Sequence, residues 1–193
     1  MDYTEGTEVE KISRAKKNML WFGMISLSMS FAGLTSAYVI SKERPDWLTD
    51  FQIPQAFYIS LVLILISSVT FHFAKKSVQK EDNKLGMLLL VTTLILGVLF
   101  VLFQFRGFSE IIESGYYFTG SESTITTSFV YLVVLMHLAH IFVALISVLV
   151  VIYNHYKQKY ENGKTLGVEL AATFWHFVDI VWIYLFLFLY FVK

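Results

Sequence analysis

Long apolar stretches alternate with short polar connections along most of this chain. Five stretches carry the pattern, at residues 18–40, 56–74, 85–105, 126–153 and 168–192. Each holds about 20 residues or more, the length that a helix needs to cross the hydrocarbon core of a bilayer. Backbone polar groups inside lipid must be bonded within their own segment, so these stretches predict helices. We therefore expect an all-α fold, a polytopic membrane helix bundle with five transmembrane helices.

Composition agrees with a membrane protein and excludes several other classes. Of 193 residues, 56% are hydrophobic and 17% are aromatic, and the formal net charge is zero. No basic domain or tail suggests a nucleic-acid partner. The chain has no cysteine, which excludes disulfides, thiolate catalysis and iron–sulfur clusters. We expect two parts, a cytoplasmic N-terminal lead at residues 1–17 and a five-helix membrane domain at residues 18–193.

The distribution of basic residues predicts the orientation of the bundle. The N-terminal lead and the connections at 75–84 and 154–167 hold 11 of the 15 Lys and Arg residues. The connections at 41–55 and 106–125 and the C-terminus hold the other 4. Connections rich in Lys and Arg stay in the cytoplasm. The N-terminus is therefore expected in the cytoplasm and the C-terminus outside.

Small residues in two of the stretches predict close helix packing. Gly23, Gly33 and several serines and alanines lie in the first span, and Gly86 and Gly97 lie in the third. Small side chains allow the backbones of membrane helices to approach each other closely. We expect the first span to pack tightly against a neighbour, and the third to do so at its glycines.

Ionisable side chains inside the spans are the candidate functional residues. The last span carries Glu169, His176 and Asp179 within one half of the helix circumference, and the fourth carries His137 and His140. Such groups are expensive in lipid and usually face the bundle interior. Three roles are open for the histidines: structural hydrogen bonding, proton relay, and ligation of a heme or metal. One hypothesis pairs Asp179 with His140, directly or through His176 or a water; its rival has Asp179 face a partner subunit.

The last span also carries a family resemblance. Its string Phe174-Trp175-His176-Phe177-Val178-Asp179-Ile180-Val181-Trp182 resembles the last-helix signature of subunit III of the heme-copper oxidases. The string His137-Leu138-Ala139-His140-Ile141 and the pair Gln104-Phe105 resemble further elements of that family. We expect no catalytic, cofactor-binding or metal-binding residue. The expected polar network, or contact with lipid or subunit I, comprises His137, His140, Glu169, His176, Asp179, Trp175, Trp182 and Gln104.

The chain departs from the family pattern at several points. Family members commonly have seven helices, and five resembles the shorter bacterial form that lacks the first two. Many members carry a buried glutamate in the first of these five spans, where Leu27 stands here. Arg106 stands where a glutamate often follows the Gln-aromatic pair. A role attached to the missing first-span glutamate is not carried over.

The resemblance implies a non-catalytic subunit of an aerobic terminal oxidase, either a cytochrome c oxidase or a quinol oxidase. In the family, subunit III contains no heme or copper; these lie in subunits I and II. Subunit III packs directly against subunit I, binds phospholipid, and supports sustained proton uptake. The resemblance implies a multi-pass protein of the bacterial cytoplasmic (inner) membrane, with subunits I and II as partners and a larger respiratory supercomplex left open.

Two other classes remain open from the residues alone. A heme-binding membrane cytochrome would need histidines from different helices to face each other across the heme. A proton-coupled membrane carrier would need Asp179, Glu169 and the histidines to line a water-filled path. Both depend on which side chains the fold brings together.

Overall fold

Five long helices make up most of the computed structural model, which describes residues 7–45, 47–48, 51–120, 123–160 and 163–192. They are α1 Glu8–Ile40, α2 Gln55–Gln79, α3 Asn83–Glu113, α4 Ile125–Tyr156 and α5 Leu166–Phe191, with a short 3₁₀ helix, η1 Ser41–Glu43, after α1. All five long helices are apolar enough to cross a membrane. The predicted five-helix, all-α fold is confirmed. Residues 1–6 of the expected N-terminal lead lie outside the described residues.

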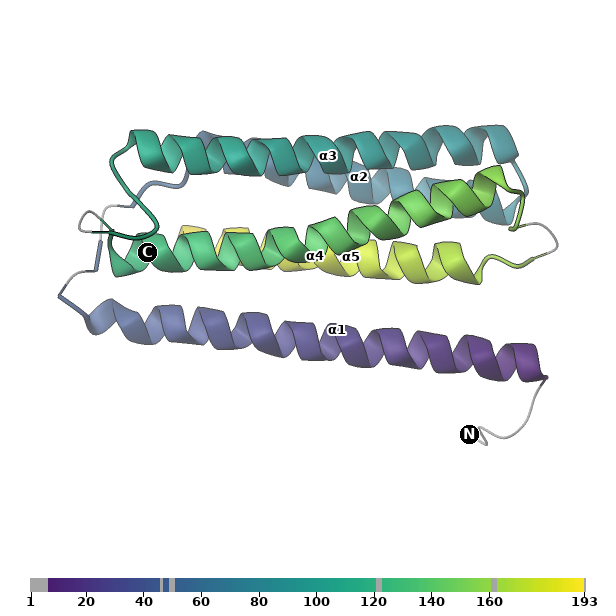
Figure 1. Ribbon diagram of the computed structural model, residues 1–193, viewed down its shortest axis with the longest axis horizontal. Coiled ribbons are helices and arrows are strands. Elements are labelled where there is room, and N and C mark those ends of the chain that lie inside the picture. Colours follow the sequence, from purple (N-terminus) through teal and green to yellow (C-terminus); the bar gives the residue numbers. More distant parts are fainter. Residues whose placement is uncertain (1–6, 46, 49–50, 121–122, 161–162, 193) are drawn as a thin grey trace.

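The helices run up and down along one axis (Figure 1), and the contacts between them show that four form a closed ring. Around this ring α2 packs on α3, α3 on α4, α4 on α5, and α5 back on α2. Helix α1 lies along the outside of the ring, where it contacts α4 and α5. Each ring helix therefore buries two sides, whereas α1 buries only the stripe formed by Met24, Phe31, Thr35 and Tyr38.

Helix α1 begins earlier than the apolar pattern indicates, because a capping box starts it. The Thr7 hydroxyl accepts a hydrogen bond from the Glu10 backbone N–H at 3.4 Å, and the Glu10 carboxylate accepts one from the Thr7 N–H at 2.9 Å. This exchange satisfies two backbone donors that a helix start leaves unpaired. The second half of the polar lead, from Glu8 on, is therefore helical and continuous with the first span.

Three separate contacts hold α1 on the ring. Near its start, the Lys17 ammonium lies 2.8 Å from a carboxylate oxygen of Glu169 on α5. In its second half, the Thr35 hydroxyl bonds the Tyr184 hydroxyl at 2.9 Å. Near its end, the ring of Tyr38 packs edge-on against three aromatic rings, including that of Phe188 at 5.3 Å between centroids. These contacts attach the part of α1 from Lys17 to Tyr38 to the ring.

Glycines on α3 mark the closest helix contacts, whereas those on α1 do not. A Cβ atom added at Gly97 would lie 2.6 Å from the Trp175 ring, and one added at Gly107 would collide with the ring of Phe57. At Gly23 and Gly33 such an atom would meet nothing within 4 Å. The expected close packing of the third span is confirmed at Gly97 and at Gly86, where an added Cβ atom would lie 3.0 Å from Val78 and 3.2 Å from His155. Within this chain the expectation for the glycines of the first span is wrong, because they lie on the side of α1 that faces away from the ring.

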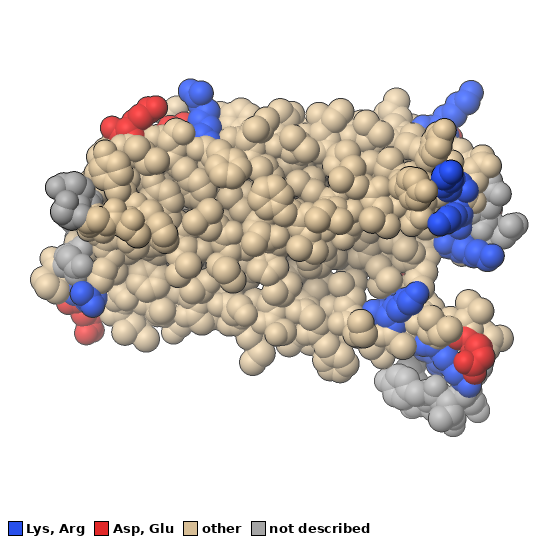
Figure 2. Space-filling model, in the orientation of Figure 1, with Lys and Arg blue, Asp and Glu red and all other residues tan. Residues whose placement is uncertain are grey.

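Basic side chains gather at one end of the bundle (Figure 2). This end holds the start of α1 and the connections between α2 and α3 and between α4 and α5. It is the end to which the sequence assigns 11 of the 15 Lys and Arg residues. We refer to it below as the basic end.

Candidate functional site: a polar network between helices

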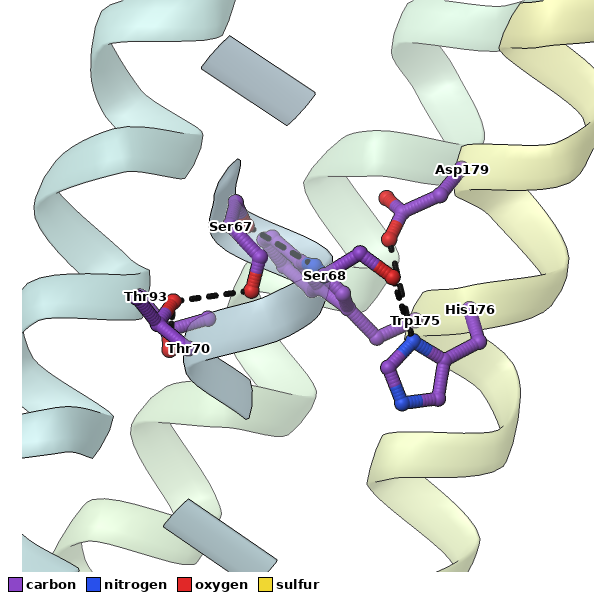
Figure 3. Close-up of polar contacts among 7 residues, drawn as sticks. All are labelled: Ser67, Ser68, Thr70, Thr93, Trp175, His176 and Asp179. Carbon is purple, nitrogen blue, oxygen red and sulfur yellow. Dashed lines mark hydrogen bonds and ion pairs between the residues drawn. The ribbon is translucent and has the colours of Figure 1, made fainter. Parts of the chain in front are cut away.

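A buried carboxylate on α5 lies beside a histidine and a serine. Asp179 is 2% exposed, and one of its oxygens lies 3.9 Å from Nδ1 of His176, one helical turn earlier. The same ring nitrogen bonds the hydroxyl of Ser68 on α2 at 2.7 Å. Figure 3 shows the Ser68 hydroxyl close to the line that joins the carboxylate to the imidazole. These three side chains connect α2 to the middle of α5.

The order of these three groups excludes a serine-hydrolase relay. In that relay the serine and the carboxylate bond opposite nitrogens of the histidine ring. Here Ser68 and Asp179 both approach Nδ1 of His176. The proton transfers that activate a serine nucleophile therefore have no path through this ring. The three side chains instead form a polar contact between α2 and α5 inside the bundle.

The hypothesised bond between Asp179 and His140 is not formed. His140 lies on α4, where its Nδ1 is 2.6 Å from the backbone oxygen of Met136 and its ring packs 5.5 Å from that of Phe31 on α1. Asp179 instead lies beside His176, which the hypothesis allowed only as a bridge. The two residues have matching depths, but depth does not fix the side of the helix on which each one lies.

A second group of hydrogen bonds joins α5, α2 and α3. The indole N–H of Trp175 donates to the Ser67 hydroxyl at 3.0 Å. One turn along α2, Thr70 bonds Thr93 of α3 at 2.9 Å (Figure 3). Ser67 and Thr93 are fully buried, so neither water nor a lipid headgroup can supply alternative partners for them. Hydrogen bonds of this kind fix the rotation of membrane helices, because they form only when the two side chains face each other at the same level.

Gln104 makes a further link between α2 and α3, nearer the end of the bundle opposite the basic end. Its side-chain N–H donates to the Ser60 hydroxyl at 2.9 Å, and Ser60 in turn donates to the Phe57 backbone oxygen on its own helix. Gln104 and Ser60 are both 0% exposed. The glutamine of the Gln-aromatic pair therefore lies at a helix interface, and its neighbour Phe105 lies on the outer surface.

His137 and Trp182 form an aromatic centre between the ring helices. Their rings stack at 5.1 Å with an interplanar angle of 26°. Phe100 on α3 packs edge-on against both, at 5.9 Å from His137 and 5.4 Å from Trp182. Both His137 and Trp182 are 0% exposed. His137 is thus enclosed by aromatic rings, whereas His140 on the same helix is only partly buried against α1.

Glu169 joins three helices at the basic end. Besides the ion pair with Lys17 of α1, it accepts a hydrogen bond from the Gln79 amide of α2 at 3.4 Å and one from the Thr165 hydroxyl at 3.1 Å. A carboxylate that is surrounded by donors on several helices is satisfied without a bound ligand. This residue therefore connects the starts of α1 and α5 to the end of α2.

The histidines and acids do not gather into a metal site in the described part of the chain. No group of three or more His, Cys, Asp or Glu side chains there could hold a metal ion. The structure pairs His72 with His176, with ring centroids 6.3 Å apart, and places His137 and His140 near Phe31 of α1. These four histidines thus form two separate groups, His72 with His176 between α2 and α5, and His137 with His140 on α4, so no single site brings all four together.

Several partners in this network were not among the predicted site residues. They are three serines that bond Gln104, Trp175 and His176, and two threonines that bond each other: Ser60, Ser67, Ser68, Thr70 and Thr93. One signal could have found part of this set. Ser60 and Ser67 are seven residues apart and so lie on one face of α2, in an otherwise apolar span. The partner that each serine meets depends on the packing of the helices, which the sequence pattern does not contain.

The fold and the network define a class of protein: a polytopic helical membrane protein in which several intramembrane polar side chains bond groups on other helices of the same chain. A family model described as "Cytochrome c oxidase subunit III" matches residues 20–193. The chain therefore belongs to the cytochrome c oxidase subunit III family, as the last-helix string predicts.

Individual relatives agree over most of the chain. It is 29% identical over 185 residues to subunit 3 of the cytochrome bo(3) ubiquinol oxidase of Buchnera aphidicola, covering 94% of this chain and 89% of that protein. It is 28% identical over 176 residues to cytochrome c oxidase subunit 3 of Corynebacterium diphtheriae, covering 86% and 82%. A probable cytochrome c oxidase subunit 3 of Rickettsia prowazekii is 32% identical over 142 residues, 72% of this chain and 48% of that protein.

Proposed function

We propose that this chain is the non-catalytic subunit III of an aerobic terminal heme-copper oxidase, with a cytochrome c oxidase as the complex. The observation that carries the proposal is the family match, which extends over all five spans. The polar network supports it, because Glu169, Gln104, Trp175 and His176 all bond groups on other helices of the same chain. Side chains used in this way stabilise a scaffold and are poorly placed for redox chemistry.

In this proposal the chain binds subunit I directly and contacts subunit II and other subunits in the same complex. The hemes and copper lie in subunits I and II, and this chain holds none. Its role is to stabilise subunit I and to support sustained proton uptake and oxygen reduction, with phospholipid bound at its surface. The exposed apolar side chains on the outer faces of α3 and α4 suit acyl chains.

We also propose that the chain lies in a bacterial cytoplasmic membrane with its basic end in the cytoplasm. The excess of Lys and Arg at that end supports this orientation. Helix α1 then crosses from inside to outside, and the C-terminal end of α5 lies outside. Glu169 and Lys17 are placed near the cytoplasmic surface, and Gln104 lies toward the outer side.

Cysteine labelling tests the orientation directly, because the chain has no natural cysteine. Single cysteines at Lys80, Ser114 and Lys159 would occupy exposed positions at the two ends of the bundle. A membrane-impermeant maleimide applied to intact cells should label only Ser114→Cys, and all three variants should be labelled after permeabilisation. Labelling of Lys80→Cys and Lys159→Cys in intact cells, with Ser114→Cys protected, would invert the orientation.

A further inference from the structure

Two polar stripes face each other along α2 and α5. On α2 the stripe contains Ser68, His72, Lys75 and Gln79, and on α5 it contains Glu169, Thr173 and His176, with Asp179 at its inner end. Residues with these three- and four-residue spacings lie on one side of a helix. Contacts join the stripes at both ends and in between, because Gln79 bonds Glu169, His72 packs on His176, and Ser68 bonds His176. We call these eight residues the α2–α5 polar seam.

The seam is open on its outer side. His72 is exposed, and the side chain of His176 is 31% exposed although it lies about ten residues into α5. Figure 3 shows the second ring nitrogen of His176 pointing away from Ser68 and Asp179. Toward the basic end, a cavity of about 190 Å³ lies between α1 and the seam, and it is lined by Lys17, Trp21, Lys75, Glu169 and Thr173, among others.

Other outward faces of the bundle need no polar partner. On α3 and α4 the exposed positions in the middle of each span are apolar, for example Ile95 and Ile146. Serines on the outside of α1, such as Ser28 and Ser30, bond the carbonyl groups of their own helix at 2.9 and 3.2 Å. An imidazole ring such as that of His72 carries two nitrogens. One hydrogen bond to its own helix, as the serines make, would leave the second nitrogen without a partner in hydrocarbon. The open polar seam is therefore unlike the remaining lipid-facing surface.

Lipid does not suit the inner part of this surface. From Gln79 to Ser68 the seam extends for about 16 Å along α2, at 1.5 Å per residue. A phospholipid brings its polar atoms only to the headgroup level, so acyl chains would cover His72 and His176 without bonding them. A transmembrane helix can carry a hydrogen-bonding side chain at any depth, and such polar pairs join helices in membranes.

We propose that the α2–α5 polar seam is the surface on which this chain docks a transmembrane helix of a neighbouring oxidase subunit. That helix presents a hydrogen-bonding side chain level with His72 and His176. The inference rests on the proposed function, because it requires a multi-subunit complex. It goes further by naming the helices that face the partner, and it leaves the outer faces of α3 and α4 to lipid.

Site-specific photo-crosslinking in the intact complex tests the assignment. A benzophenone amino acid would be placed beside the seam at Val69 and Ile180, which follow Ser68 and Asp179 and are 55% and 62% exposed. Matched controls are Ile95 on α3 and Ile146 on α4, which are 54% and 60% exposed. Illumination should join the chain to another oxidase polypeptide from Val69 and Ile180, whereas Ile95 and Ile146 should give lipid adducts alone. Protein cross-links from the α3 and α4 positions with lipid adducts from the seam, or a cross-link between two copies of this chain, would overturn the inference.

A substitution on the seam separates a polar contact from simple proximity. His72→Leu should speed loss of this chain from the purified complex about three- to fifteen-fold, the range expected for one interhelical polar pair. Phe73→Leu is the matched control, because Phe73 is the next residue and is 52% exposed. Equal dissociation of the two variants would overturn the proposed polar contact. If the wild-type chain purified alone, the proposed function itself would fail; if it purified in the complex but cross-linked elsewhere, only the docking surface would be wrong.

Discussion

Leucine at Gly97 or Gly107 is expected to disrupt the bundle severely. The Cβ atom alone would lie 2.6 Å from the Trp175 ring and 2.8 Å from Leu145 at the first position, and would collide with Phe57 at the second. These neighbours are buried side chains that cannot move into open space. Overpacking a dense core by a few atoms costs about 1–3 kcal/mol, and a whole leucine side chain should exceed that range. The measurement is the fraction of chain recovered folded and monodisperse after extraction in mild detergent.

Glycines on α1 provide the control for this prediction. Gly23 and Gly33 also lie inside a long helix, but an added Cβ atom meets nothing within 4 Å at either position. Leucine at Gly23 or Gly33 should leave recovery of the isolated chain near that of the natural sequence. If the α1 substitutions were as damaging as those on α3, the packing described for α3 would not be the cause.

Truncation of Trp182 to alanine is expected to destabilise the bundle strongly. The indole is 0% exposed and packs against rings from three other helices: Phe57 at 5.7 Å, Phe100 at 5.4 Å and His137 at 5.1 Å. Removing a buried tryptophan leaves a cavity and typically costs about 3–5 kcal/mol. The free energy of unfolding by SDS in mixed micelles would measure the loss.

Trp21 is the matched control for Trp182. It lies on α1 beside the cavity next to the seam and is 58% exposed. Trp21→Ala should change the free energy of unfolding by well under 1 kcal/mol, as surface substitutions usually do. An equal loss for both tryptophans would contradict the central position assigned to Trp182.

The spans themselves could be predicted because hydrocarbon imposes a simple rule on them. A run of about 20 apolar residues must form a helix there. That rule does not apply to residues that lie outside the hydrocarbon. Helix α1 extends back to Glu8 because of the Thr7–Glu10 capping box, and α3 continues to Glu113, past the end of the predicted span at Phe105. Both extensions lie in sequence that mixes polar and apolar residues, which a search for long apolar runs does not detect.

The contact partners of side chains within the bundle were harder to predict than the depths of those side chains in the membrane. The sequence places Asp179 and His140 at similar levels, yet α5 turns Asp179 toward Ser68 and His176, while His140 packs beside Phe31 of α1. Depth follows from counting residues, but rotation and neighbour order depend on the packing of all five helices. The glycines show the same dependence on helix packing. Composition indicates that α1 and α3 can both approach closely, and only the fold shows that α3 uses this property within the chain.

Purification of the chain from its own membranes tests the central claim, that it is a non-catalytic oxidase subunit. The tagged chain, extracted in mild detergent, should bring with it a larger oxidase polypeptide and a heme spectrum. When this chain is then stripped away, the heme should stay with the larger polypeptide, and the isolated chain should show no Soret band. A stoichiometric heme on the isolated chain that disappears with His137→Leu would contradict the account and identify a membrane cytochrome instead.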